Sequence, residues 1–120
     1  MSFDPRDFCS IAEQVAQFGT ESAFRTAVGR SYYAAFLVAR EKTGIRTRKG
    51  RKSVHQRIIE DIRNRKGYKP IGDQLSTLYW LRIVADYHLV PKSTYANWPN
   101  NWSRAQQIMT HILPKLQSLK

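Results

Sequence analysis

A helix that is apolar on nearly every side sets the strongest limit on how this sequence can fold. The stretch 27–39 is apolar almost all round and is interrupted only at residues 29–31. Such a helix has to be covered on every side. Thr20 is suited to cap it and Gly44 to end it, so we expect it to run to about Thr43 at the centre of a helical bundle. Because the chain supplies few other helices, we expect a second protomer to provide part of the cover.

Four further helices are expected from the spacing of apolar residues and from capping signals. They span about 3–18, 53–66, 70–87 and 101–120, and Asn101 is the expected cap of the last one. No stretch shows the alternation of apolar and polar residues that is typical of a strand. We therefore predict a single all-α domain over residues 1–120, an up-and-down bundle of about five helices.

The cysteine content and the lengths of the apolar runs indicate where in the cell the protein is found. Cys9 is the only cysteine, so no internal disulfide forms, and the chain has no signal-like start. The longest apolar run, 32–39, is far shorter than the ~20 residues of a membrane-spanning helix. We expect a cytoplasmic protein that does not enter a membrane, with Cys9 as a packed thiol.

Positive charge is concentrated in one segment. The chain has 20 Lys and Arg against 9 Asp and Glu, and residues 40–69 alone hold twelve of the basic residues and three of the acidic ones. Such a patch is typical of a protein that binds a polyanion, most often nucleic acid; an anionic membrane surface and a merely soluble basic surface are the alternatives. We predict that RNA contacts eight side chains, here called the basic surface: Arg46, Arg48, Lys49, Arg51, Lys52, Arg63, Arg65 and Lys66. The 45–52 loop that carries five of them is expected to be mobile.

The 70–87 helix carries an arginine on its packing face and a histidine at its expected end. Arg82 falls on the apolar line of this helix, and Pro91 should unwind the chain before it, which places His88 at or near the helix end. On an unbroken helix the two side chains would stand roughly 120° apart around the axis. Unwinding after Tyr87, or pairing with a second copy of the helix, would bring them together.

Arginine with histidine suits phosphodiester chemistry. An imidazole can take a proton from a ribose 2′-hydroxyl near neutral pH, and a guanidinium can hold the charged phosphorus centre with two donors. The products would carry 2′,3′-cyclic phosphate ends. In the noncatalytic alternative, Arg82 pairs with Asp86 one turn on and His88 is a satisfied residue at a helix end. The scattered histidines and lone cysteine offer no set of metal ligands, so we expect no metal and no other cofactor.

Three other side chains were candidates for a site. His55 falls in the first turn of the expected 53–66 helix and reads as a capping or surface residue, and His111 is expected to face solvent. Arg30 lies in the apolar pattern of the long helix. It is either a core arginine paired with a carboxylate or a second cation that faces the ligand.

Two stretches resemble the HEPN superfamily of small helical nucleotide- and RNA-binding domains. They are RTAVGRSYYAAFLVAR at 25–40 and LRIVADYHL at 81–89, and the resemblance covers nearly the whole chain. It implies a helical bundle that forms a homodimer and, in many members, a metal-independent endoribonuclease. In those members an Arg and a His from both protomers face a shared cleft; Arg82 and His88 match these positions, and we assign supporting roles to Asp86 and Arg30.

The resemblance also implies two kinds of partner. Some small members are toxins that a separate minimal nucleotidyltransferase neutralises, which makes such an antitoxin a candidate partner here. Related proteins that lack the histidine are noncatalytic modules that bind RNA, nucleotides or a partner protein. An endoribonuclease and a noncatalytic module are therefore the two functions expected.

Overall fold

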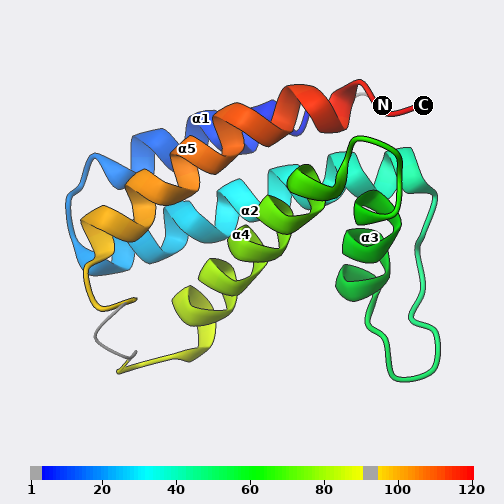
Figure 1. The fold of residues 1–120 in the computed structure, drawn as a ribbon. Helices are drawn as coiled ribbons and strands as arrows, with labels where there is room; N and C mark the ends of the chain where they lie inside the picture. Colours follow the sequence, from blue (N-terminus) through cyan, green and yellow to red (C-terminus); the bar gives the residue numbers. More distant parts are fainter. Residues whose placement is uncertain (1–3, 91–94) are drawn as a thin grey trace.

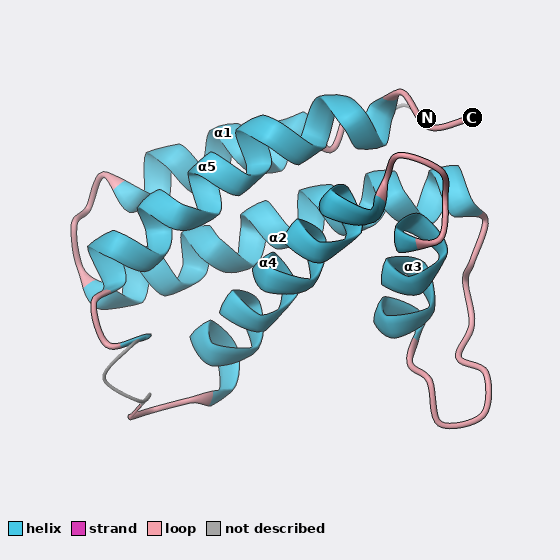
Figure 2. Cartoon of the chain, in the orientation of Figure 1, coloured by secondary structure: helices cyan, strands magenta, loops and turns pink. Residues whose placement is uncertain are grey.

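The chain folds into helices joined by two short connections and two longer ones, the basic segment 44–53 and the segment 88–97. The computed structural model describes residues 4–90 and 95–120, and none of these forms a β-strand. The elements are α1 (Arg6–Ala16), α2 (Glu21–Thr43), α3 (Val54–Arg63), α4 (Lys69–Tyr87) and α5 (Trp98–Gln117) (Figures 1 and 2). The all-α prediction is confirmed. No helix in the described ranges is both long and apolar enough to cross a lipid bilayer.

The second helix forms the centre of the bundle. In Figure 1, α1 and α5 run together along one side of α2, α4 crosses its other side, and the short α3 stands at one end beside α4. The buried side chains of α2 include Val28, Tyr32, Phe36 and Val38, and all four other helices contact it. The same chain covers most of α2, although Tyr33 is 41% exposed; that a second protomer provides part of the cover stays a prediction.

Both ends of α2 and the start of α3 lie where we expected them, whereas α3 ends at Arg63 and not near residue 66. The Thr20 hydroxyl accepts a hydrogen bond from the backbone N–H of Ala23, and Gly44 ends α2 with a positive φ of 71°, which favours glycine. At α3, Ser53 and Gln56 form the reciprocal pair of side-chain to backbone hydrogen bonds called a capping box. These local signals fix where the 45–52 loop begins and ends.

The last helix begins earlier than expected. Its N-cap is Asn97, whose side chain accepts a hydrogen bond from the backbone N–H of Asn100, and Pro99 lies in the first turn. A proline is tolerated there because the first turn lacks intrahelical partners for its N–H groups. Asn101, the expected cap, is instead buried inside the helix and donates to the Tyr95 carbonyl at 2.9 Å.

A glycine brings α3 and α4 close together. A Cβ atom added at Gly72 would lie 2.9 Å from the backbone nitrogen of Arg63, closer than real Cβ contacts. The absence of a side chain at Gly72 therefore lets α3 pack directly on the first turns of α4.

Candidate functional site

Arg82 lies where α4 crosses α2, held by a carboxylate one turn further on. Its Nε atom lies 2.9 Å from Oδ2 of Asp86, and its side chain is 27% exposed. Asp86 lies against α2, since a Cβ added at Gly29 would be 3.7 Å from its Oδ1. The ion pair considered in the noncatalytic alternative therefore forms. It uses Nε, which leaves the two Nη groups of Arg82 as donors for a ligand.

His88 stands at the end of α4, as predicted, but faces a different side of the helix from Arg82. It is the C-cap residue, with extended backbone angles and an N–H that donates to the Val84 carbonyl at 3.1 Å. Its ring meets the ring of Trp80 edge-on, with centroids 5.5 Å apart. Residues 80 and 82 point about 200° apart around a helix. A single chain therefore does not bring Arg82 and His88 together.

Arg25 fastens the end of α4 to α2, a role that no sequence pattern indicated. Its guanidinium donates to the carbonyls of Val84 at 3.3 Å, Ala85 at 3.0 Å and Leu89 at 3.4 Å. It also lies 4.5 Å from the ring centroid of Trp98. A cation that binds the last carbonyls of a helix is favourable to the helix dipole. Arg25 thus fixes the turn that carries His88.

His55 is not the surface or capping residue that we expected. It is half-buried among Tyr32, Phe36 and Tyr79, and its ring stacks on Tyr79 with centroids 4.8 Å apart. Its Nδ1 lies 2.6 Å from the Tyr32 hydroxyl oxygen. A signal was present in the sequence, because His55 precedes three buried isoleucines by three, four and seven positions. His111 is exposed, as expected, and bonds Gln74.

The surroundings of His55 determine which ring nitrogen carries the proton. Burial lowers the pKa of His55, as does the charge of Arg82 to a lesser extent, so the imidazole is neutral at pH 7. Burial raises the pKa of the Tyr32 hydroxyl, which stays protonated. No other described group accepts that buried hydroxyl proton, so Tyr32 donates to Nδ1. The proton of the neutral His55 ring is therefore on Nε2.

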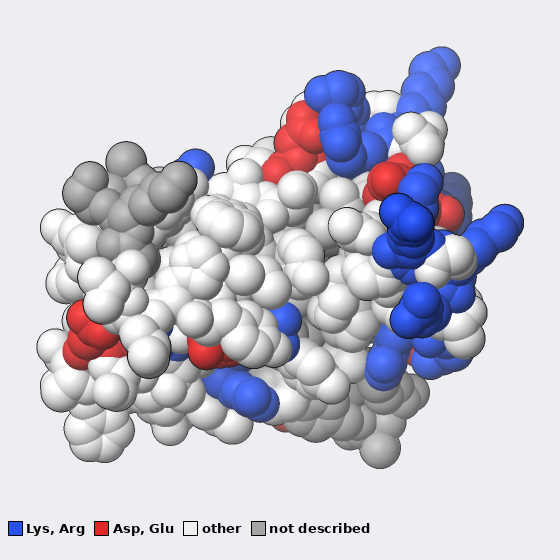
Figure 3. Space-filling model, turned by 90° about the horizontal axis from the view of Figure 1, so that it is seen from below, with Lys and Arg blue, Asp and Glu red and all other residues white. Residues whose placement is uncertain are grey.

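The basic surface lies at one end of the molecule. Lys and Arg gather there, around α3 and the loop before it, while the rest of the face in Figure 3 carries few charges. Lys49, Arg51 and Lys66 make no ion pair with any described residue, and Arg48 donates only to the Gly50 carbonyl. Four of the eight side chains pair with carboxylates at 2.7–3.2 Å: Arg46 with Glu41, Lys52 with Glu60, Arg63 with Asp73 and Arg65 with Asp61.

The 45–52 loop, which we expected to be mobile, is tied to α3 by hydrogen bonds. Lys49 and Lys52 exchange two backbone hydrogen bonds of 3.0 Å around Gly50, whose φ is 59°. The Arg57 guanidinium, on α3, donates to the Thr47 carbonyl. Between loop and helix lies a cavity of about 570 Å³, here called the loop–α3 cavity, lined by Arg46, Thr47, Arg48, Arg51, Ser53, Val54 and His55.

One of the two roles expected of Arg30 is wrong, while its role as a second cation that faces the ligand stays a prediction. Its side chain is exposed, not buried, and its guanidinium carbon lies 5.5 Å from the ring centroid of Phe8 and 5.8 Å from that of Tyr33. It is therefore not a core arginine paired with a carboxylate. It packs on the α1 side of α2, whereas the neighbouring Gly29 faces Asp86 of α4.

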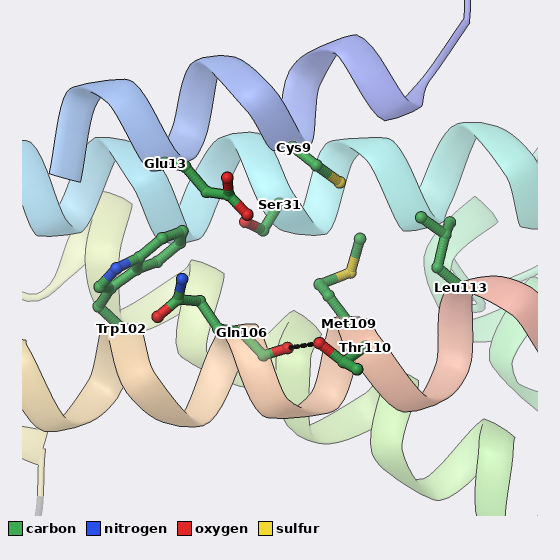
Figure 4. Close-up of a pocket in the computed structure, with 8 residues that line it drawn as sticks. All are labelled: Cys9, Glu13, Ser31, Trp102, Gln106, Met109, Thr110 and Leu113. Carbon is green, nitrogen blue, oxygen red and sulfur yellow. Dashed lines mark hydrogen bonds between the residues drawn. The ribbon is translucent and has the colours of Figure 1, made fainter. Parts of the chain in front are cut away.

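A second cavity, of about 190 Å³, lies between α1, α2 and α5 (Figure 4). The ionisable side chains that line it are Cys9 and Glu13, and Ser31 and Gln106 project toward it. Burial raises the pKa of the Cys9 thiol, and the charges of Glu13 and Asp4 raise it further. Because the thiolate is the nucleophile, a protonated thiol is poorly suited to covalent chemistry. Cys9 is a packed thiol, as expected.

No protein-family model, curated protein or solved structure matches this chain. The resemblance to the HEPN superfamily stays a prediction, resting on the two quoted stretches.

Proposed function

We propose that this chain binds RNA through the basic surface and, as a homodimer of HEPN type, cleaves RNA without a metal ion. The observation that carries the proposal is the gathering of cations at the α3 end of the molecule (Figure 3). The carboxylates that pair with four of these cations do not prevent RNA binding. An exposed ion pair contributes only about 0–1 kcal/mol, so an RNA phosphate can take the place of the carboxylate. Binding to the RNA backbone would also release counterions.

The proposed chemistry is transfer of the phosphodiester to the neighbouring ribose hydroxyl. His88 takes the proton of the 2′-hydroxyl, whose oxygen attacks phosphorus while the bond from phosphorus to the 5′-oxygen breaks. The 5′-oxygen takes a proton from water, and the resulting hydroxide takes the proton from His88. Arg82 binds the non-bridging oxygens through its free Nη groups, with its plane held by Asp86. The products are a 2′,3′-cyclic phosphate and a 5′-hydroxyl end.

Two protomers are needed for this reaction, because Arg82 and His88 of one chain face different sides of α4. The proposed site combines Arg82 of one protomer with the partner's His88. Support comes from the apolar side chains left exposed around the end of α4, since large exposed apolar patches mark interaction sites. These are Trp80, Tyr87, Leu89 and Val90, the last two about 90% exposed.

Mixing two inactive variants tests the shared site. Arg82→Ala and His88→Ala proteins are each expected to lose cleavage. After subunit exchange, an equal mixture should recover about one quarter of the wild-type activity, because half of the dimers are mixed and each has one intact site. Failure to recover activity, with mixed dimers present, would exclude the shared site.

Product analysis tests the reaction itself. RNA incubated with the protein in excess chelator should be cut to products with 2′,3′-cyclic phosphate ends. Light scattering should give a dimer; a 14.0 kDa species at micromolar concentration would contradict the proposal.

The second candidate is a noncatalytic RNA-binding module. One observation favours it: in the single chain Arg82 is already paired with Asp86, and His88 is packed on Trp80. Binding without cleavage in the same assay would support this function. Neither binding nor cleavage would point to a scaffold for a protein partner, for which the resemblance suggests a minimal nucleotidyltransferase. In each case we place the protein in the cytoplasm, where its cysteine stays reduced.

A further inference from the structure

We infer that the loop–α3 cavity binds a phosphomonoester, the terminal phosphate of a nucleotide or of an RNA end. This inference rests on the proposed function only in taking RNA as the source of that phosphate. Neither Arg82 nor His88 lines the cavity, which is built from the 45–52 loop, the first turn of α3 and the ring of His55.

The charge of the cavity suits a dianion. Three arginines line it, and no Asp or Glu is among the described residues that do so. Arg51 has no ion pair there, and Arg48 is engaged only by a backbone carbonyl. Arg46 shares an exposed pair with Glu41 that a phosphate can displace. A guanidinium binds phosphate oxygens through two parallel hydrogen bonds, which a lysine cannot do.

The arginines are held near one another before a ligand arrives. The paired backbone bonds between Lys49 and Lys52 close the loop into a short hairpin. Lys52 is fastened to Glu60 of α3 at 2.7 Å, and the Arg57 guanidinium binds the Thr47 carbonyl. Binding therefore costs less conformational entropy than it would if the loop had to become ordered.

His55 adds a neutral donor to the cavity. Its Nδ1 accepts the Tyr32 proton, so the nitrogen left for a ligand is Nε2, which carries a hydrogen. A terminal phosphate has three acceptor oxygens and a charge of about −1.5 to −2 at pH 7. A phosphodiester within a strand offers two such oxygens and one charge. Three arginines and an N–H donor thus match a terminal phosphate better than an internal one, and about 570 Å³ is enough for a nucleotide.

Fluorescence anisotropy with matched oligonucleotides tests the inference. The probes are 2′-O-methyl RNA strands of one sequence, which cannot be cleaved through a 2′-hydroxyl, bearing a 5′-phosphate, a 3′-phosphate or neither. At fixed ionic strength, at least one phosphorylated strand should bind about tenfold more tightly than the unphosphorylated one, as expected for a charge-assisted contact. Competition by adenosine 5′-monophosphate and by inorganic phosphate distinguishes a nucleotide site from a site for the free ion.

Two exposed cations of the basic surface provide the variant and its control. Arg51→Ala should abolish the preference for the phosphorylated strand, because Arg51 lines the cavity and makes no ion pair with a described residue. Lys66→Ala should lower the affinity for the phosphorylated and the unphosphorylated strand by the same factor, since Lys66 does not line the cavity. Equal affinity for all strands, or an Arg51→Ala variant that keeps the preference, would overturn the inference. Adenosine 5′-monophosphate binding that Arg51→Ala removes, without any RNA binding, would keep it and refute the proposed function.

Discussion

The hydrogen bonds from Arg25 to the end of α4 give a prediction with a magnitude. Substituting Arg25 with alanine removes bonds to three carbonyls, of which the bond to Ala85, at 3.0 Å, is the shortest. It also removes a cation–π contact to Trp98 at 4.5 Å and an exposed ion pair with Glu21 at 3.1 Å. A hydrogen bond from a charged group contributes about 1.5–3 kcal/mol net. The other contacts of Arg25 offset the conformational entropy that its side chain loses on folding. We expect Arg25→Ala to lower the free energy of unfolding by about 2–3 kcal/mol.

Thermal and urea unfolding measure this loss. For 120 residues the entropy of unfolding is about 0.25 kcal/mol/K, so the melting temperature should fall by about 8–12 °C. Arg25→Lys should lose roughly half as much, because an ammonium keeps the charge near the helix end without the planar fork. Arg6→Ala, which removes an exposed ion pair with Asp4, is the control and should leave the melting temperature unchanged.

Hydrogen exchange shows whether the loss is local. The amide of His88, which donates to the Val84 carbonyl, should lose protection in Arg25→Ala before the amides of central α2 do. A melting temperature within about 2 °C of wild type, with unchanged exchange at His88, would refute the idea that Arg25 holds this turn.

Five further outcomes are expected. The logarithm of RNA affinity should fall with the logarithm of salt concentration with a slope of about −3.5, from roughly −0.7 for each of five phosphate contacts on a single strand; an affinity indifferent to salt would contradict the role of the basic surface. His88→Ala should slow cleavage by about 10²- to 10⁴-fold with little change in RNA affinity, measured by gel assay and anisotropy. In the same assays Arg82→Lys should be poorly active, since it lacks the fork, and Asp86→Ala should lose activity modestly, because the Arg82 guanidinium would be less well oriented. The lowered pKa of His55 means that the unfolded chain binds more protons below about pH 6.5, so this residue destabilises the fold as the pH falls; the melting temperature of His55→Phe should therefore decline less between pH 7 and 5 than that of wild type.

A contrasting result would favour the noncatalytic module. If Arg82→Ala and His88→Ala lower the melting temperature and leave any activity per folded molecule untouched, the two residues serve the fold alone. The ion pair of Arg82 with Asp86 and the contact of His88 with Trp80 would then explain their presence.

Local chemistry made the helices predictable from the sequence. Gly44 and the Ser53–Gln56 capping box act within a few residues of the ends they set, and both ends were predicted. The start of α5 was misplaced because Asn97 and Asn101 are both good caps. Pro99, which fits the first turn of a helix, was the signal that distinguished them.

The candidate site was predicted less completely, because its contacts join distant segments. Arg82 and Asp86 lie one turn apart on one helix, so their pairing was visible in the sequence. His55 meets Tyr32 across 23 positions, and Arg25 meets Ala85 across 60. Helical periodicity says that a residue faces inward but not what it meets there. Arg30 shows the converse, since a position within an apolar stretch still reached the surface beside Phe8.

The close packing at Gly72 links the position of the cations to the core. Gly72 lies on α4 and determines how closely α3 can approach that helix. The basic surface is carried by α3 and the adjoining loops. A methyl group at this position would push α3 away from α4, and because Ile58, Ile59 and Ile62 of α3 belong to the core, it would disturb core packing as well as move the charged face. The placement of the cations relative to the rest of the molecule thus depends on one residue that lies outside the basic surface.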